Sequence, residues 1–422
     1  MHETAWTADD PRWYANRMRS VAALLALLAS ATAVRAACIG CTSKPVPFSD
    51  RLVRAVVTKL ASDELQGRDN DTPGSDDAQA FLVKRLRRAG RGVDPSKRKA
   101  EAFKQHFTFN GQIGTNLLAV VRGRELPNEY VIVGAHYDHL DTRSDANGHC
   151  RSGGMPGGDV CNGATDNATG AATVIAIGRA LKKHPPRRSV VLALWDSEED
   201  GLVGSLYYVN NPLVPLAKTV AYVNFDILGS DLLPHLATTS FAVGPETGMG
   251  LTEVVLAAIA AERLDTLPIS YIFGQLRSDY ASFVAVKVPT VFFSDSTNGC
   301  YHTTADDLDV VDWAKLAKQG RIALRVTSAL AETATPPVFV PPNPNLAVFA
   351  DAVTLQQVFM RALPDQSLFS ASDQQVLLGI GDALDHIVAD GPSAFDQGDV
   401  AMTLQTALDG IAAIQGLGCR KP

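Results

Sequence analysis

Residues 189–200 read SVVLALWDSEED and residues 130–139 read YVIVGAHYDH, so that in both stretches an apolar run leads directly into ionisable side chains. Each run is short and contains β-branched valine or isoleucine, which is typical of a β-strand. Neither run alternates with polar residues, which indicates that both faces of the strand are covered, as in a parallel sheet. The two stretches therefore predict buried strands whose ends carry ionisable groups.

Strand and helix patterns alternate through the chain up to residue 335. Further apolar runs of strand length occupy residues 116–122, 220–226, 269–273 and 290–294. Helical spacing of apolar residues occurs at 49–90 (with a glycine-rich break at 66–75), 168–183, 201–210, 252–264 and 278–286. This alternation predicts an α/β fold with a mostly parallel central sheet covered by helices on both faces. In such folds ligands bind at the carboxyl ends of the strands.

The amino-acid composition and the net charge exclude several classes of protein. The chain has 422 residues, of which 46% are hydrophobic, enough to bury a sizeable core and too many for a disordered or collagen-like chain. The formal net charge is −7 and no basic stripe offsets it, so nucleic acid is not an expected partner.

The chain after residue 335 differs in composition. Five prolines between 336 and 345 predict a stiff linker that follows a main domain at 37–335. Residues 346–422 have helical spacing, nine aspartates and no glutamate. We expect a small acidic helical appendage there, with its carboxylates in solvent.

The amino terminus has the pattern of an export signal. Residues 21–34 (VAALLALLASATAV) form an apolar run too short to span a membrane, and a small-residue cleavage site follows it. We predict a signal peptide at 1–36, with translation starting at Met18, and therefore a secreted or periplasmic protein with no membrane span in the mature chain. The alternative is a lipoprotein modified at Cys38.

Six cysteines in an exported chain indicate disulfides. Cys150 and Cys161 bracket a glycine-rich loop and form the favoured local pair. Cys38 and Cys41 offer a redox pair as an alternative, although they lack the usual strand–helix setting.

Ionisable residues gather where the predicted strands end. Taken singly, each has an ordinary explanation: a buried core histidine, a helix cap, or a solvated pair of glutamates. Only Asp226, at the end of an apolar strand, must be paired or bind metal. Together they share one edge of the sheet, which favours a functional site. The candidates are His136, Asp166, Glu198, Glu199, Asp226 and His302.

The two imidazoles and three of these carboxylates (Asp166, Asp226 and one glutamate), without a thiolate, form a ligand set that suits zinc, with Co²⁺ or Mn²⁺ as substitutes. One tetrahedral ion cannot use five protein ligands and still keep a water, whereas two ions about 3.5–4 Å apart can use them all. Asp166 is the expected ligand of both ions, because it lies between the other candidates in the sequence and on a different structural element.

The motifs GAHYDH, GATDNATG, SEEDGLVGS, NFD and CYHTTADD, in this order, resemble the metal motifs of the secreted di-zinc aminopeptidases of peptidase clan MH. The resemblance covers about residues 49–334 and implies a zinc exopeptidase of phosphorylase/hydrolase-like fold. It implies that His136 and Asp226 hold one ion, that Glu199 and His302 hold the other, and that Asp166 bridges them.

By the same resemblance, Glu198 is the general base and Asp138 is the partner that orients His136. Glu198 would take a proton from the water that attacks and pass it to the leaving amine. The substrate is then a peptide with a free N-terminus. The family commonly has Ser-Asp-His where this chain has SDY at 278–280, and the oxyanion donor stays open between Tyr280 and Tyr301.

Other functions remain within the same fold. A single-zinc glutaminyl cyclase is the second enzymatic interpretation, although the presence of both His136 and Asp226 favours two ions. A carboxypeptidase-like hydrolase would need a basic clamp for the substrate carboxylate. A non-catalytic binding ectodomain is the alternative from a different class.

Overall fold

The computed structural model of the chain describes residues 47–142, 149–154, 158–343 and 346–421. Residues 47–422 form one compact unit. The predictions of a signal peptide at 1–36, a start at Met18 and roles for Cys38 and Cys41 lie outside the described residues. Within them, no helix combines the length and apolarity that crossing a membrane requires.

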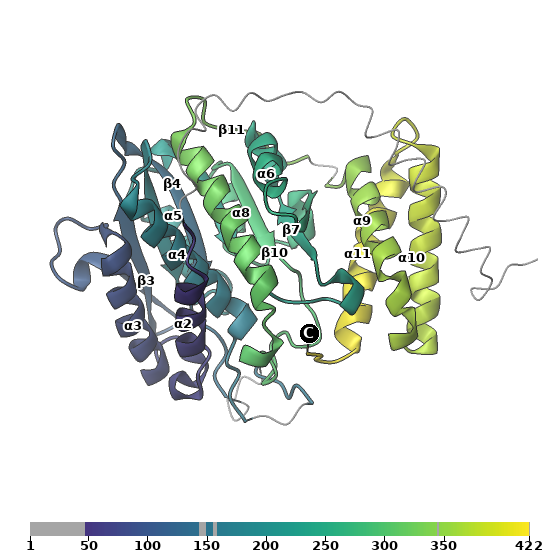
Figure 1. Ribbon diagram of the computed structural model, residues 1–422, viewed down its shortest axis with the longest axis horizontal. Helices are drawn as coiled ribbons and strands as arrows, with labels where there is room; N and C mark the ends of the chain where they lie inside the picture. Colours follow the sequence, from purple (N-terminus) through teal and green to yellow (C-terminus); the bar gives the residue numbers. More distant parts are fainter. Residues whose placement is uncertain (1–46, 143–148, 155–157, 344–345, 422) are drawn as a thin grey trace, which may run out of the picture. The chain divides into compact units, whose positions relative to one another are not determined.

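A nine-stranded mixed sheet forms the centre of the molecule (Figure 1). Its middle strands β5, β4, β6 and β10 run parallel to one another in this spatial order. Because they are parallel, their carboxyl ends share one edge of the sheet. The four strands are β4 (Leu126–His136), β5 (Arg188–Trp195), β6 (Thr219–Phe225) and β10 (Thr290–Ser294).

Antiparallel strands flank this parallel centre. On one side β3 pairs antiparallel with β5, and β1 and β2 pair with β3; on the other, β7 pairs antiparallel with β10 and parallel with β9. These strands are β1 (Arg91–Gly92), β2 (Lys104–Phe109), β3 (Gln112–Val121), β7 (Thr239–Val243) and β9 (Asp265–Ile269).

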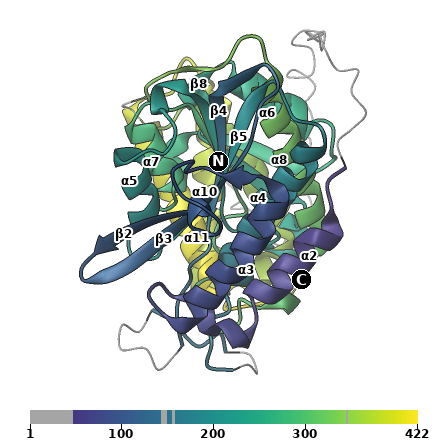
Figure 2. The same cartoon turned by 90° about the vertical axis from the view of Figure 1, so that its left-hand side faces the viewer.

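Helices cover both faces of the sheet (Figure 2). One face is covered by α4 (Thr169–Lys183) and α8 (Trp313–Glu332), with α2 (Asp50–Leu60) and α3 (Pro73–Ala89) packed against α4. The other is covered by α5 (Val203–Asn210) and α7 (Tyr280–Ala285). All eight residues of β5 are buried, which accounts for its unbroken apolar run.

Three helices follow the proline-rich segment and pack as a group (Figure 1). They are α9 (Phe349–Ala362), α10 (Ala371–Asp390) and α11 (Gln397–Gly416). Within the segment, β11 (Val338–Phe339) pairs with β8 (Gly248–Met249). The division into a domain, a linker and an appendage stays a prediction.

The α/β fold with a mostly parallel centre is confirmed, with three corrections. The strand expected at 269–273 ends at Ile269, and a 3-10 turn follows it. The helix expected at 252–264 is α6 (Leu251–Ile259), which is shorter. The C-terminal carboxylates are not all in solvent, because Asp351 and Asp365 are buried and hydrogen-bonded to Ser270 and His235.

Candidate metal centre

Asp166 lies between two groups of side chains. Its Oδ1 is 3.2 Å from His136 Nε2, and its Oδ2 is 3.3 Å from His302 Nε2. Burial opposes its ionisation, but the two histidines outweigh this and hold the pKa of Asp166 well below its usual range. The carboxylate therefore offers one oxygen to each group.

The first group contains His136, Asp166 and Asp226, whose ligand atoms all lie within 4.8 Å of one another. His136 ends β4 and Asp226 directly follows β6, the neighbouring parallel strand. His136 Nε2 is 3.3 Å from Asp226 Oδ1. The register of two adjacent strands thus brings these two side chains together at the carboxyl edge.

The second group contains Glu199, His302 and Asp166. Glu199 Oε2 is 3.0 Å from His302 Nε2. A further histidine, His139, joins it: His139 Nδ1 is 2.8 Å from Glu199 Oε1, and these two residues with Asp166 also satisfy the spacing of metal ligands. His139 was given no role from the sequence, although it stands in the HYDH motif itself.

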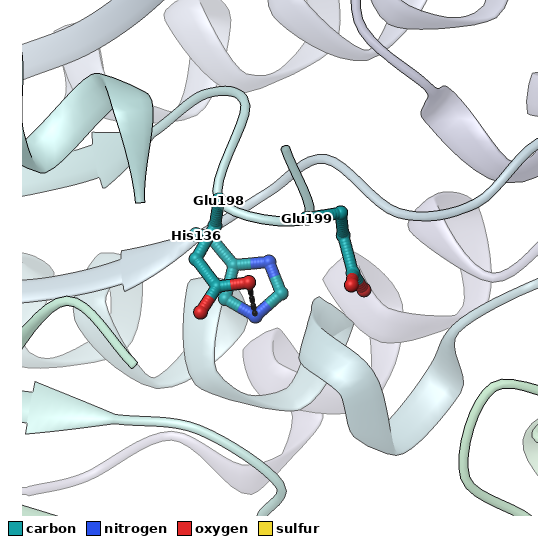
Figure 3. Close-up of side chains that lie close together, drawn as sticks. All are labelled: His136, Glu198 and Glu199. Carbon is teal, nitrogen blue, oxygen red and sulfur yellow. Dashed lines mark ion pairs between the residues drawn. The ribbon is translucent and has the colours of Figure 1, made fainter. Parts of the chain in front are cut away.

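The two adjacent glutamates have different surroundings. Figure 3 shows the carboxylate of Glu198 beside the imidazole of His136 and Glu199 next to Glu198 on the same loop, and the ligand atoms of all three residues lie within 4.8 Å of one another. Burial raises the pKa of Glu198 well above its usual range. Burial and Asp166 oppose the ionisation of Glu199, but His302 and His139 outweigh them and hold its pKa at about 2. Neighbouring carboxyl groups whose pKa values are driven apart are suited to different roles.

Asp138 lies between His136 and the loop that carries Glu199. Its Oδ2 accepts a hydrogen bond of 3.1 Å from the backbone amide of Glu199. Its Oδ1 is 3.6 Å from His136 Nδ1, whereas the backbone oxygen of Asp138 is closer to this nitrogen, at 3.2 Å. Asp138 therefore links the loop after β4 to the loop after β5.

Two buried residues that the sequence did not single out hold the backbone of the site. Asp306 accepts hydrogen bonds from the amides of Thr165 and Asp166. The Arg68 guanidinium donates to backbone oxygens on three segments, and burial lowers its pKa to about 10. Its acceptors are the carbonyls of Leu60, Tyr137, Asn162 and Gly163.

The loop between β4 and α4 is hydrogen-bonded to the backbone of His302. Cys150 and Cys161, the pair favoured from the sequence, are bonded to each other. The amide of Arg151, next to this disulfide, donates to the carbonyl of His302 at 3.1 Å. A second disulfide joins Cys300 to Cys419.

The two tyrosines considered as oxyanion donors lie in different places. The Tyr280 hydroxyl is directed into the protein, where it donates to the carbonyl of Tyr271 at 3.0 Å. The Tyr301 ring stacks on His302, with the ring centroids 3.8 Å apart. Asp279, in the SDY sequence, is buried, and burial raises its pKa to about 7.

The donor set fits divalent metal ions. Asp166 Oδ2 and His302 Nε2 are buried and close together, yet neither makes a hydrogen bond. Two ligands of a tetrahedral zinc ion, each about 2.0–2.2 Å from the metal, lie about 3.4 Å apart, close to the observed 3.0–3.3 Å separations. Several carboxylates buried together also need positive charge to balance them.

The amino-acid sequence and the fold are similar to those of known peptidases. The family model described as "Peptidase family M28" matches residues 116–327. Leupeptin-inactivating enzyme 1 of Streptomyces exfoliatus is 27% identical over 277 residues, which cover 58% of this chain and 57% of that enzyme. A probable zinc metalloprotease of Leptosphaeria maculans is 23% identical over 66% of this chain and 74% of its own length.

Solved structures share the fold. A zinc aminopeptidase from Bacillus subtilis superposes with a TM-score of 0.54 at 14% identity, over 71% of this chain and all of that one. A glutaminyl cyclase from Bacteroides thetaiotaomicron superposes with a TM-score of 0.52 at 17% identity, over 67% of this chain and 99% of that one.

The match over residues 116–327, together with the shared fold, shows that the chain belongs to peptidase family M28. The family match ends at residue 327, before α9, so α9–α11 lie outside it.

Proposed function

We propose that this chain is an exported aminopeptidase that holds two zinc ions and removes N-terminal residues from peptides. The observation that carries the proposal is the position of Asp166, with one carboxylate oxygen toward His136 and Asp226 and the other toward Glu199 and His302. A bridging carboxylate between two such groups is typical of two-metal hydrolases.

Bound at these residues, the ions would polarise the scissile carbonyl and lower the pKa of a water. Glu198 is the proposed base, which would take a proton from the attacking water and return it to the leaving amine. Burial raises its pKa above that of an ordinary carboxyl group, which makes the carboxylate a stronger base. Glu199, whose pKa is lowered, stays ionised and serves as a ligand.

A glutaminyl cyclase is the second candidate, because structures of such enzymes share this fold. The two candidates differ in products. An aminopeptidase releases free amino acids from many peptides, whereas a cyclase converts only N-terminal glutamine and releases ammonia.

The test is a set of aminoacyl chromogenic amides and a glutamine-initiated peptide, each assayed with and without a chelator. We expect chelator-sensitive release of chromophore, and no release when the α-amine of the same compound is acetylated. Equal turnover of acetylated and free compounds would contradict the aminopeptidase. Ammonia release from the glutamine peptide alone would establish the cyclase instead. Export is tested separately: the secreted protein should begin at Ala37.

A further inference from the structure

A cavity of about 200 Å³ lies between the start of α2 and the carboxyl-terminal parts of α3 and α4. Both α2 and α3 pack against α4 on one face of the sheet (Figure 2). The candidate metal centre is at the opposite end of α4, because Asp166 lies just before this helix. A helix of 15 residues is about 22 Å long, so the cavity is remote from the proposed reaction.

The cavity has an unusual charge. Four basic side chains line it, and no acidic residue of the described part of the chain does. The chain as a whole carries a formal net charge of −7, so these cations form a local excess of positive charge. The basic cluster consists of Arg85 and Arg88 on α3 and of Arg179 and Lys183 on α4.

Basic residues near the end of a helix often have an ordinary role, because they bind the last carbonyls and interact favourably with the helix dipole. Arg179 and Lys182 have this role at the end of α3, where each donates to the carbonyl of Arg88 at 3.0 Å. The side chains of Arg85, Arg88 and Lys183 make no hydrogen bond or ion pair with any described residue. Capping of α3 therefore accounts for one member of the basic cluster and leaves three cations unpaired.

The surroundings of Arg85 show the effect of this excess charge. Its guanidinium is half-buried and lies over the ring of Phe81, 4.6 Å from the ring centroid. Burial and the charge of Arg88 both lower the pKa of Arg85. An anion between the two arginines would oppose this effect, because a nearby opposite charge favours the charged form.

The start of α2 adds a further favourable element. Ser49 and Leu52 line the cavity, and the first turn of a helix is the positive end of its dipole. The acidic residue of this turn, Asp50, does not line the cavity and lies 3.8 Å from Arg321. The remaining lining on α4 is apolar, which strengthens electrostatic attraction inside the cavity.

The size of the cavity and the type of its donors indicate which anion would bind. A cavity of roughly 150 Å³ is large enough for benzene, so about 200 Å³ holds a phosphate group together with water. Guanidinium groups donate in a fork that matches two phosphate oxygens at once, and lysine also binds phosphate as a point charge. Several positive charges around one space favour an anion with more than one negative charge.

We propose that the cavity between α2, α3 and α4 is an anion site in which the basic cluster binds a phosphate group. This site is separate from the candidate metal centre, and the proposal does not depend on the reaction there. Free phosphate and the phosphate of a lipid headgroup offer the same chemistry, so the test includes a probe for each.

The test compares two double variants of α3 that lose the same charge. Arg85→Gln combined with Arg88→Gln removes half of the basic cluster. Lys84→Gln combined with Arg87→Gln is the matched control, because both residues are exposed, belong to the same part of α3 and do not line the cavity.

The first measurement is calorimetric titration of the zinc-loaded full chain with inorganic phosphate. The Arg85→Gln, Arg88→Gln variant should bind phosphate at least about tenfold more weakly than the wild-type chain, because it loses hydrogen bonds between charged groups. The control variant should bind as the wild-type chain does. Phosphate that binds at the metal ions is affected by neither pair of substitutions, so the difference between the variants reports on the cavity alone.

The second measurement is sedimentation of the same chains with phosphatidylcholine vesicles that contain phosphatidic acid, with pure phosphatidylcholine vesicles as the blank. A loss of phosphate binding in the Arg85→Gln, Arg88→Gln variant alone assigns the site to free phosphate. If only vesicle binding shows this difference between the variants, the site takes a lipid headgroup. If the two double variants bind inorganic phosphate alike and also bind the vesicles alike, the proposal is overturned.

Discussion

The carboxylate of Asp306 accepts a hydrogen bond of 3.0 Å at Oδ2 from the backbone amide of Asp166. Its Oδ1 accepts two more, from the amide and the hydroxyl of Thr165, at 2.9 and 2.8 Å. Asp306 is fully buried and lies in the same loop as His302. One carboxylate thus fixes the backbone of the proposed bridging ligand to the loop that carries a ligand of the second group.

Asp306→Ala should therefore weaken metal binding although Asp306 is not itself a ligand. Groups that orient metal ligands typically contribute 10–100-fold in affinity. We expect a loss in this range, measured by competition for zinc with a chromophoric chelator. Asp309→Asn, a change at an exposed residue three positions later, is the control and should bind zinc as the wild-type chain does. Equal affinity in both variants would contradict this role of Asp306.

The adjacent glutamates should respond differently to the same substitution. Glu198→Gln should keep both ions and lower kcat by about 10²–10⁴, because it removes only the proton acceptor. Glu199→Gln should lose one ion, because an amide is a poor replacement for an ionised ligand. Metal analysis alongside steady-state kinetics checks both expectations. Loss of an ion from Glu198→Gln would mean that Glu198 is a ligand and that the base is another group.

Arg68 should be required for stability. Its replacement by methionine leaves four backbone carbonyls without this donor, and each buried unsatisfied group costs about 1–3 kcal/mol. We expect Arg68→Met to lower the free energy of unfolding by at least about 3 kcal/mol, measured by urea denaturation. Arg179→Met, at an exposed arginine that also donates to a carbonyl, should cost less than about 1 kcal/mol. Comparable losses in the two variants would refute the role of Arg68.

Glu246 should make stability depend on pH. Burial raises its pKa to about 7, and its Oε1 accepts a hydrogen bond of 2.7 Å from the amide of Tyr271. As pH rises from 4.5 to 7, the unfolded chain releases this proton while the folded chain retains it. The free energy of unfolding of the wild-type chain therefore falls between these pH values. The free energy of unfolding of Glu246→Gln minus that of the wild-type chain should therefore be larger at pH 8 than at pH 4.5, by up to about 3 kcal/mol.

Urea denaturation of both chains at several pH values between 4.5 and 8 checks this expectation. Glu253→Gln, at an exposed glutamate on α6, is the control and should follow the wild-type curve. If the stability difference between Glu246→Gln and the wild-type chain stays constant over this range, the Glu246 carboxyl does not titrate as described.

Much of the fold follows from local patterns. The strands β4, β5, β6 and β10 are predictable because each contains an unbroken apolar run, which is typical of strands covered on both faces. The residues after Ile269 form a turn although Tyr271–Phe273 are as apolar as a strand, and Ile272 and Phe273 line a cavity beside the metal centre. Local sequence does not distinguish a side chain buried in the sheet from one that lines a pocket.

Residues of the candidate site that were overlooked act through contacts distant in sequence. Arg68 reaches the carbonyl of Gly163, 95 residues away, and Asp306 reaches Asp166, 140 residues away. The residues around Arg68 indicate only a turn, and Asp306 stands in the CYHTTADD motif without a local sign that it holds the backbone of Asp166. His139 had a local signal in the HYDH motif, but only its 2.8 Å separation from Glu199 reveals a role.

The count of metal ions in the purified chain tests the central claim, that two ions share Asp166, most directly. Elemental analysis of the full chain at neutral pH, after dialysis against metal-free buffer, should give about two zinc ions per chain. The Asp166→Ala variant should lose both ions. Chromatography of this variant first establishes that it is folded. One ion per chain in the wild-type protein, or two ions retained in Asp166→Ala, would contradict the account.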